Sequence, residues 1–166
     1  MTVHDHAAGT SVVGLIDFGD MVYTWTVSEI AIAAAYLLIT LRYPNDARPS
    51  DTPGAAGAAA GDVTDADVAP RPLDNDEIAL LAALVGPYAD AHPLTESEWA
   101  VLPTLIASRI AMSLIIGSYS SSQDPQNLYL RITLRPGWEA LRALRAVPNA
   151  RLLRAMRNDE VRGAPP

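Results

Sequence analysis

The chain has 166 residues, no cysteine and a formal net charge of −7. An acidic balance argues against nucleic acid as the main partner, because phosphate backbones need a basic surface. The lack of cysteine excludes disulfides, thiol catalysis and cysteine-ligated zinc, and it is typical of a cytoplasmic protein. An apolar content of 49% supports a packed core in one domain or a large part of one.

No apolar stretch of the sequence predicts a membrane span. The longest, Ile30 to Leu41, is shorter than the roughly 20 residues that a bilayer requires. The first residues lack the basic start and the apolar core of a signal peptide. We therefore expect a cytoplasmic protein with neither a membrane nor a nucleic acid as its partner.

Residues 1–18 are expected to form a β-hairpin, because Val12 to Ile16 is a short apolar run of β-type residues and Gly9 lies near the expected tip. A helix is then predicted from about Val27 to Arg42. Thr26 suits its N-cap, and Glu29 stands three residues later, as in a capping box. This helix is apolar nearly all round, which predicts that it is buried within a bundle.

Residues 44–73 lose every apolar period and consist mainly of Pro, Ala, Gly, Asp and Ser. This composition predicts a disordered acidic surface insertion. A passive exposed loop is the favoured interpretation, and a docking segment is the alternative.

Helical periodicity resumes in residues 74–158. Asp74 with Glu77 predicts a capping box for a helix to about Val85, which Gly86-Pro87 should end or kink. A second capping signature, from Thr95 and Glu98, precedes a long helix that reaches about Ser118 and that Pro103 should bend.

Residues 125–134 are expected to form a short helical or irregular link, and Pro136 suits the first turn of a helix through about Val147. A last short helix is predicted over 148–158, and residues 159–166 should fray. The predicted fold class is α+β and mostly helical: an N-terminal β-hairpin followed by a bundle of about five helices. The hairpin, its strand and the first helix form one unit, residues 1–43, and residues 74–158 form the helical remainder.

The segment Gly14 to Asp20 reads Gly-Leu-Ile-Asp-Phe-Gly-Asp and places a carboxylate where a strand ends. Mg²⁺ is usually held by one or two carboxylates together with substrate phosphates, and an Asp-Phe-Gly aspartate has this role in protein kinases. Asp17 is therefore the candidate metal and nucleotide ligand. A turn aspartate that caps a neighbouring amide is the alternative. Asp20 is a weaker second candidate, acting through water.

The stretch from Gly14 to Tyr36 resembles the aminoglycoside phosphotransferase/choline kinase superfamily. It is most similar to the hydroxylysine kinases and to bacterial phosphotransferase domains fused to class III aminotransferases. A second block agrees, made of four pieces: Pro93–Trp99, Ala107–Ser113, Asp124–Tyr129 and Pro136–Trp138.

This resemblance covers roughly residues 10–43 and 77–145. It implies the C-terminal part of a protein-kinase-like C-lobe, Mg²⁺ with ATP or GTP, and an amino-alcohol acceptor for which 5-hydroxylysine is the nearest analogue. It also implies roles for single residues. Glu29 would support the catalytic-loop backbone from below, a structural role, and Trp25, Tyr119 and Tyr129 would line the acceptor pocket. For any one of these aromatic residues, core packing is the favoured alternative.

Kinases of this superfamily have an N-terminal lobe with a nucleotide-gripping lysine and a catalytic loop of the form His-x-Asp-x-x-x-x-Asn. This chain has no lysine and no such loop, and His4-Asp5-His6 lacks its spacing. Phosphoryl transfer needs several positioned groups at once. We therefore expect little kinase activity from this polypeptide by itself and assign no catalytic residue within it.

Arg109 interrupts the apolar run from Leu105 to Ile116, and an arginine on a buried helix generally has an anionic partner. An ion pair with Glu29 is favoured, and a substrate carboxylate is the alternative. The three histidines, His4, His6 and His92, do not form a metal set.

Arginines recur along the last two predicted helices, at positions 142, 145, 151, 154 and 157. A solvated amphipathic face is the favoured interpretation, and a surface for an anionic partner is the alternative.

Two functions of different classes follow from the sequence. The first is a partial small-molecule phosphotransferase that carries the metal strand but lacks the N-lobe and the catalytic loop. The second is a non-catalytic helical interaction module, or one half of a split kinase, and a piece of a kinase–aminotransferase fusion is a third possibility. Apolar surface left uncovered by a missing lobe predicts self-association.

Overall fold

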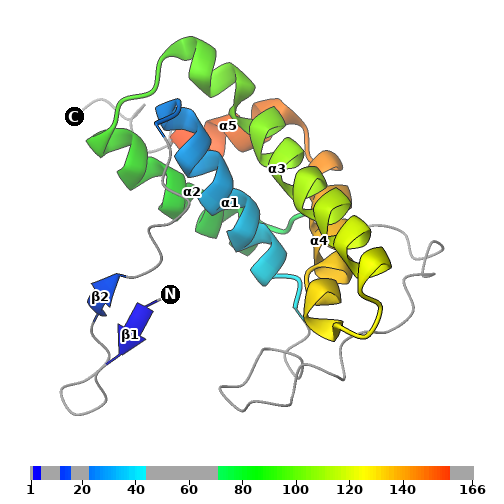
Figure 1. Ribbon diagram of the computed structural model, residues 1–166. Coiled ribbons are helices and arrows are strands. Elements are labelled where there is room, and N and C mark those ends of the chain that lie inside the picture. The colour runs from blue at the N-terminus through cyan, green and yellow to red at the C-terminus, as the bar shows by residue number, and fades with distance from the viewer. Residues whose placement is uncertain (1, 5–11, 16–22, 44–70, 158–166) are drawn as a thin grey trace, which may run out of the picture.

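A computed structural model describes residues 2–4, 12–15, 23–43 and 71–157 (Figure 1). These ranges are mostly helical, which confirms the prediction of about five helices. The helices are α1 (Thr26–Thr40), α2 (Asn75–Ala91), α3 (Glu96–Gln123), the 3₁₀ helix η2 (Leu128–Arg131), α4 (Leu134–Arg145) and α5 (Asn149–Arg157).

Two short strands precede the helices. β1 (Thr2–His4) and β2 (Val12–Leu15) pair antiparallel, with Thr2 opposite Leu15. The residues that would join them, 5–11, and the continuation of the second strand lie outside the described residues. The hairpin over 1–18 therefore stays a prediction.

Helix α1 begins one residue earlier than the sequence predicts, and its expected capping box is absent. Trp25 occupies the N-cap position and no side chain caps the helix. Because Thr26 lies inside the first turn, Glu29 is one position too far along to reach back to the N-cap amide. The burial predicted for α1 is confirmed on one face, where Val27, Ile30 and other apolar residues are almost inaccessible to solvent.

Helix α2 starts with the predicted capping box. The Asp74 carboxylate accepts from the Glu77 amide at 2.9 Å, and the Glu77 carboxylate accepts from the Asp74 amide at 3.0 Å. Of the two outcomes expected at Gly86-Pro87, an end of the helix is wrong, since α2 continues through Pro87 to Ala91; a kink there stays a prediction. Proline deprives the carbonyl four residues earlier of its helical partner. Here that carbonyl belongs to Ala83, and because Ala83 and Pro87 are both exposed, water can satisfy it.

Helix α3 is the longest element, with 28 residues, and it too starts with the predicted capping box, between Thr95 and Glu98. It passes through Pro103 and ends five residues beyond the predicted Ser118. By length and composition alone, α3 could cross a membrane. A long core helix can meet the same criterion, and α3 packs against α1, α4, η2 and α5.

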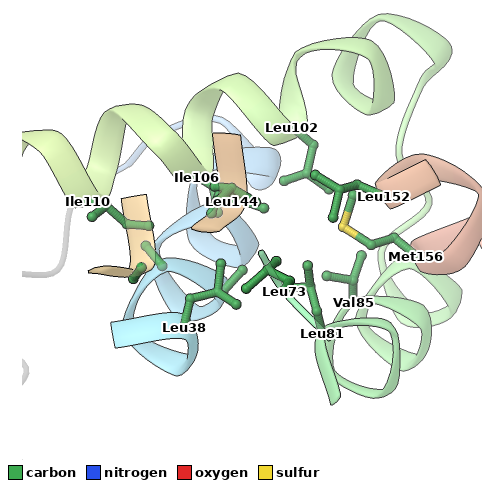
Figure 2. Close-up of a cluster of buried hydrophobic side chains, with 14 of the residues drawn as sticks. Leu38, Leu73, Leu81, Val85, Leu102, Ile106, Ile110, Leu144, Leu152 and Met156 are labelled. Carbon is green, nitrogen blue, oxygen red and sulfur yellow. The ribbon is translucent and has the colours of Figure 1, made fainter. Parts of the chain in front are cut away.

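The core lies between all five α-helices. In Figure 2, Leu38 of α1, Leu81 of α2 and Ile106 of α3 point toward a common centre. Each of these side chains is at most 1% exposed. Leu144 of α4 and Leu152 of α5 join them, so no α-helix is peripheral to the core. Burial of a leucine-sized side chain contributes about 1.5–3 kcal/mol. This shared cluster therefore stabilises the packing of all five α-helices against one another.

Helices α3 and α4 approach each other closely at a glycine. A Cβ built on Gly137 would lie 2.8 Å from Leu114 Cδ2, which is closer than real carbon contacts allow. Only glycine at this position lets α4 lie against the buried Leu114 without a shift.

The residues predicted to be a disordered insertion, 44–73, are described only from 71 onward. These last three depart from the expectation, because Leu73 is 3% exposed within the core and Arg71 forms ion pairs with Asp74 and Glu77. Residues 71–73 are therefore part of the packed helical region.

A buried ion pair joins the end of α1 to the start of α2. Arg42 Nη2 lies 2.9 Å from Glu77 Oε2, and the two side chains are 4% and 9% exposed. Arg71, which is 58% exposed, donates to the same carboxylate at 2.9 Å. Glu77 thus has partners on both of its oxygens in addition to the Asp74 amide.

Removing Arg42 should destabilise the fold far more than removing Arg71. Arg42→Met takes away the buried partner of Glu77, which typically costs about 3–5 kcal/mol, and the remaining Arg71 should keep the loss near about 3 kcal/mol. Arg71→Met removes a half-exposed partner and should cost less than about 1 kcal/mol. Urea unfolding followed by circular dichroism measures both changes. Equal losses in the two variants would contradict the assignment of Arg42 as the dominant partner.

The capping boxes should make stability fall in acid. Backbone hydrogen bonds lower the pKa of Asp74 and of Glu98 from their ordinary values of 3.8 and 4.5. A carboxylate with a lowered folded-state pKa stabilises the fold above its unfolded-state pKa, and this contribution is lost as the pH falls through the folded-state value. Unfolding free energies measured in urea should therefore decline below about pH 4.5, and Glu98→Gln should make that decline less steep. A decline of unchanged slope in Glu98→Gln would exclude Glu98 as a source.

Candidate functional site

The two carboxylates predicted to bind metal, Asp17 and Asp20, lie outside the described residues. Their roles in metal and nucleotide binding stay predictions. Within ranges 23–43 and 71–157, no three His, Asp or Glu side chains are grouped closely enough to hold a metal ion.

Glu29 is exposed at the start of α1. It lies close enough to Tyr88 of α2 to affect that side chain, since burial and then the negative charge of Glu29 raise the pKa of Tyr88. The Tyr88 hydroxyl donates to the Thr26 carbonyl at 3.0 Å and so ties the first turn of α1 to α2. The role expected for Glu29, supporting a catalytic loop, concerns a loop that this sequence lacks, so that role stays a prediction.

Arg109 pairs with a tyrosine and not with Glu29. Its Nη2 donates to the Tyr36 hydroxyl at 3.0 Å, and its guanidinium carbon lies 5.4 Å from the centre of the Tyr36 ring. A cation over an aromatic face is attracted by the ring quadrupole. Among the described residues no carboxylate pairs with Arg109, and its Nε is buried without a hydrogen-bond partner. The partner of Arg109 among the described residues is therefore Tyr36, and the buried Nε is closed to a ligand from solvent.

The three aromatic pocket candidates are all exposed: Trp25 by 76%, Tyr119 by 68% and Tyr129 by 76%. Core packing, the favoured alternative for each, is therefore wrong for these three residues. Arg109 and Tyr119 stand ten residues apart on α3, a distance of about 15 Å along the helix axis. Trp25 precedes α1 by one residue, and Figure 1 shows α1 and α3 running in the same direction, so Trp25 lies toward the opposite end from Tyr119. The structure does not bring these candidates together around one pocket.

Tyr129 has a described neighbour at the end of α1. Burial, and then the nearby Tyr129, raise the pKa of Tyr43. This places η2 beside the residues that follow α1, close to the buried Arg42. Tyr129 thus lies where η2 approaches the residues that follow α1.

A groove between α2 and α5 was not expected from the sequence. It has a volume of about 800 Å³. Ile78, Ala82 and Gly86 of α2 line one side, Trp99 of α3 contributes to the lining, and three arginines of α5 line the other side: Arg151, Arg154 and Arg157. The sequence signal was the spacing of these arginines, but the identity of the facing helix depends on tertiary packing.

Three comparisons with known proteins bear on this chain. It is 28% identical to hydroxylysine kinase of Mus musculus, 28% to that of Bos taurus and 25% to that of Xenopus laevis, in each case over 132 residues. These similarities support a relationship to kinases. They cover 79% of this chain but 26% of each relative, so the chain spans about a quarter of the length of the curated relatives it matches. No protein-family profile and no solved structure matches it.

The relationship to hydroxylysine kinases agrees with the resemblance that the Asp-Phe-Gly segment and the second sequence block suggest. It supports a relationship to kinases. The particular metal, the nucleotide and the acceptor remain matters for proposal.

Proposed function

We propose that this chain is the C-lobe portion of a small-molecule phosphotransferase of the aminoglycoside phosphotransferase/choline kinase superfamily. In this proposal Asp17 holds Mg²⁺ against the phosphates of ATP or GTP, with Asp20 assisting through water. The acceptor is an amino alcohol such as hydroxylysine. The observation that carries the proposal is the similarity to hydroxylysine kinases over 132 residues. The Gly14-to-Asp20 segment of this sequence, which resembles a kinase metal strand, agrees with it.

The chemistry that this chain contributes is metal binding and positioning. A kinase also needs a base, a second metal ligand and a cationic side chain on the phosphates, and this sequence has no lysine and no His-x-Asp-x-x-x-x-Asn loop. Those groups would come from other sequence, in the same polypeptide or in a second one. By itself the chain should transfer no phosphate at a useful rate. The proposed setting is the cytoplasm, with no membrane or nucleic acid partner.

Arg109 is the described residue best suited to an acceptor with a carboxylate. Its guanidinium is held by the Tyr36 hydroxyl and ring and has no carboxylate partner among the described residues. The Arg109 side chain is partly exposed, and a guanidinium without a carboxylate partner can bind one through two parallel hydrogen bonds. This favours the substrate-carboxylate role for Arg109 over the structural ion pair.

Replacing Asp17 should weaken divalent metal binding in the presence of nucleotide. Loss of a group that supports a metal ligand typically lowers affinity by about 10–100-fold, so loss of a direct ligand in Asp17→Asn should cost at least about tenfold. Titration of the full chain with Mn²⁺ and ATP or GTP, followed by relaxation of water protons, measures this affinity. Asp20→Asn is the matched control and should change it less. Equal affinities for the wild type and Asp17→Asn would refute the metal role.

A second candidate, a non-catalytic interaction module that associates with another copy of the chain, is favoured by an apolar row on α3. Met112, Ile115, Ile116 and Tyr119 recur at helical spacing on this helix and are 47–69% exposed. The neighbouring Gly117 faces the opposite way, against Leu134 of α4. An exposed apolar row of this kind marks an interaction surface.

Placing a charge on this apolar row should reduce self-association without unfolding the chain. Ile116→Asp puts a carboxylate on a side chain that is 56% exposed, and Leu80→Asp on α2 does the same at a site that is 47% exposed but outside the row. Sedimentation velocity over a range of concentrations should show dimers in the wild type and in Leu80→Asp, and monomers in Ile116→Asp. A wild type that stays monomeric at all concentrations would contradict this second candidate.

A further inference from the structure

The groove between α2 and α5 carries more positive charge than its neighbours neutralise. Arg151, Arg154 and Arg157 stand three residues apart on α5, and all three line the groove. Because this spacing places side chains along one stripe of a helix, the three guanidinium groups form a row.

The partners of the two outer arginines do not neutralise the positive charge of the arginine in the middle of the row. Arg151 Nη2 donates to the neutral side-chain oxygen of Asn75 at 2.8 Å. Arg157 pairs with Glu96 at 2.8 Å, and its guanidinium lies 5.1 Å from the centre of the Trp99 ring. Arg154 has no hydrogen-bonding or ionic partner among the described residues, and the Nε of Arg157 is buried without an acceptor there.

The lining that α2 contributes is mainly apolar, with several small side chains. Ile78, Ala79, Ala82 and Ala83 present it from α2, and Trp99 adds an aromatic surface beside Arg157. Gly86 leaves it open, since a Cβ built there would meet no atom within 4 Å. Asp90 is the acidic lining residue, and it has an interaction of its own.

We propose that this groove binds a small molecule that carries an oxyanion, a carboxylate or a phosphate, on a compact apolar body. Arg154 and Arg151 bind the anion, and the body lies against Ala82 and Ile78 beside Trp99. Arginine matches both oxyanions because its planar donors can form two parallel hydrogen bonds with either. A volume of about 800 Å³ falls within the range of about 300–1,000 Å³ that is usual for small-molecule sites.

Phenyl phosphate and benzoate are the probes, because both join an oxyanion to a compact apolar ring. Titration of the ¹⁵N-labelled full chain with each should shift the amide signals of Ala82, Gly86 and Arg154. Inorganic phosphate and phenol test the two parts separately and should each bind at least about tenfold more weakly than phenyl phosphate, since each lacks one set of contacts. The tighter of the two probes identifies the oxyanion.

Arg154→Gln should weaken the binding of phenyl phosphate by about tenfold or more, because hydrogen bonds to charged groups carry much of such affinity. The matched control is Arg145→Gln, which removes the same charge from an exposed arginine on α4 outside the groove. It should leave the affinity unchanged. Arg154 is exposed, so its replacement tests binding without threatening the fold.

Gly86→Leu should abolish binding by filling the groove with a side chain that meets no atom of the folded chain near its Cβ. Four results would overturn the proposal. They are the absence of shifts with either probe up to about 10 mM, equal affinity for phenol and phenyl phosphate, equal weakening by Arg145→Gln and Arg154→Gln, and undiminished binding by a folded Gly86→Leu variant.

Discussion

The described fold depends on the buried pair between Arg42 and Glu77. The pair joins the end of α1 to the start of α2, at 2.9 Å and with both side chains under 10% exposed. Burial lowers the pKa of Arg42, and the charge of Glu77 opposes that effect; an arginine nevertheless stays protonated in proteins. Two buried charges are stable together but costly apart. Any arrangement that separated α1 from α2 would leave one of them without its partner, so the pair selects a single orientation of the two helices. Tyr88, which donates to the Thr26 carbonyl, fixes the same two helices near the other end of α1.

Local features were predictable from the sequence, and contacts between distant residues were not. The capping boxes at Asp74 and Thr95 were predicted correctly because their two members stand three residues apart. The box at Thr26 was not, because the same pattern lies one residue inside the helix. Glu77 was predicted as a capping residue, but its pairing with Arg42 spans 35 positions in the sequence. Arg109 was expected to pair with Glu29, and its actual partner, Tyr36, became evident only when α1 packed beside α3. The helix after Asp74 was expected to end or kink at Gly86-Pro87. It continues, and because Ala83 is exposed, water can satisfy the carbonyl that Pro87 leaves without a helical partner.

Some of the predicted site residues are supported by the sequence alone, and others are positioned by the described part of the fold. The segment with Asp17 supplies the chemical argument for metal binding, and the similarity to hydroxylysine kinases supports its ancestry. The fold places Arg109 on α3 with Tyr36, and it places Tyr119 ten residues farther along. A small acceptor cannot contact two side chains about 15 Å apart on one helix. Arg109 is therefore the stronger pocket candidate, and Tyr119 belongs with the apolar row of Met112, Ile115 and Ile116.

The α2–α5 groove and the apolar row of α3 are separate surfaces, so each could bind its own partner. Trp99 lies in the first turn of α3 and Met112 in its second half, which sets them about 20 Å apart along the helix. A ligand in the groove and a second copy on the row could therefore be present together. Their chemistry also differs, since the groove combines three arginines with small apolar residues, whereas the row is apolar with a single tyrosine. A partner that covered the row would leave the groove open beside Arg154.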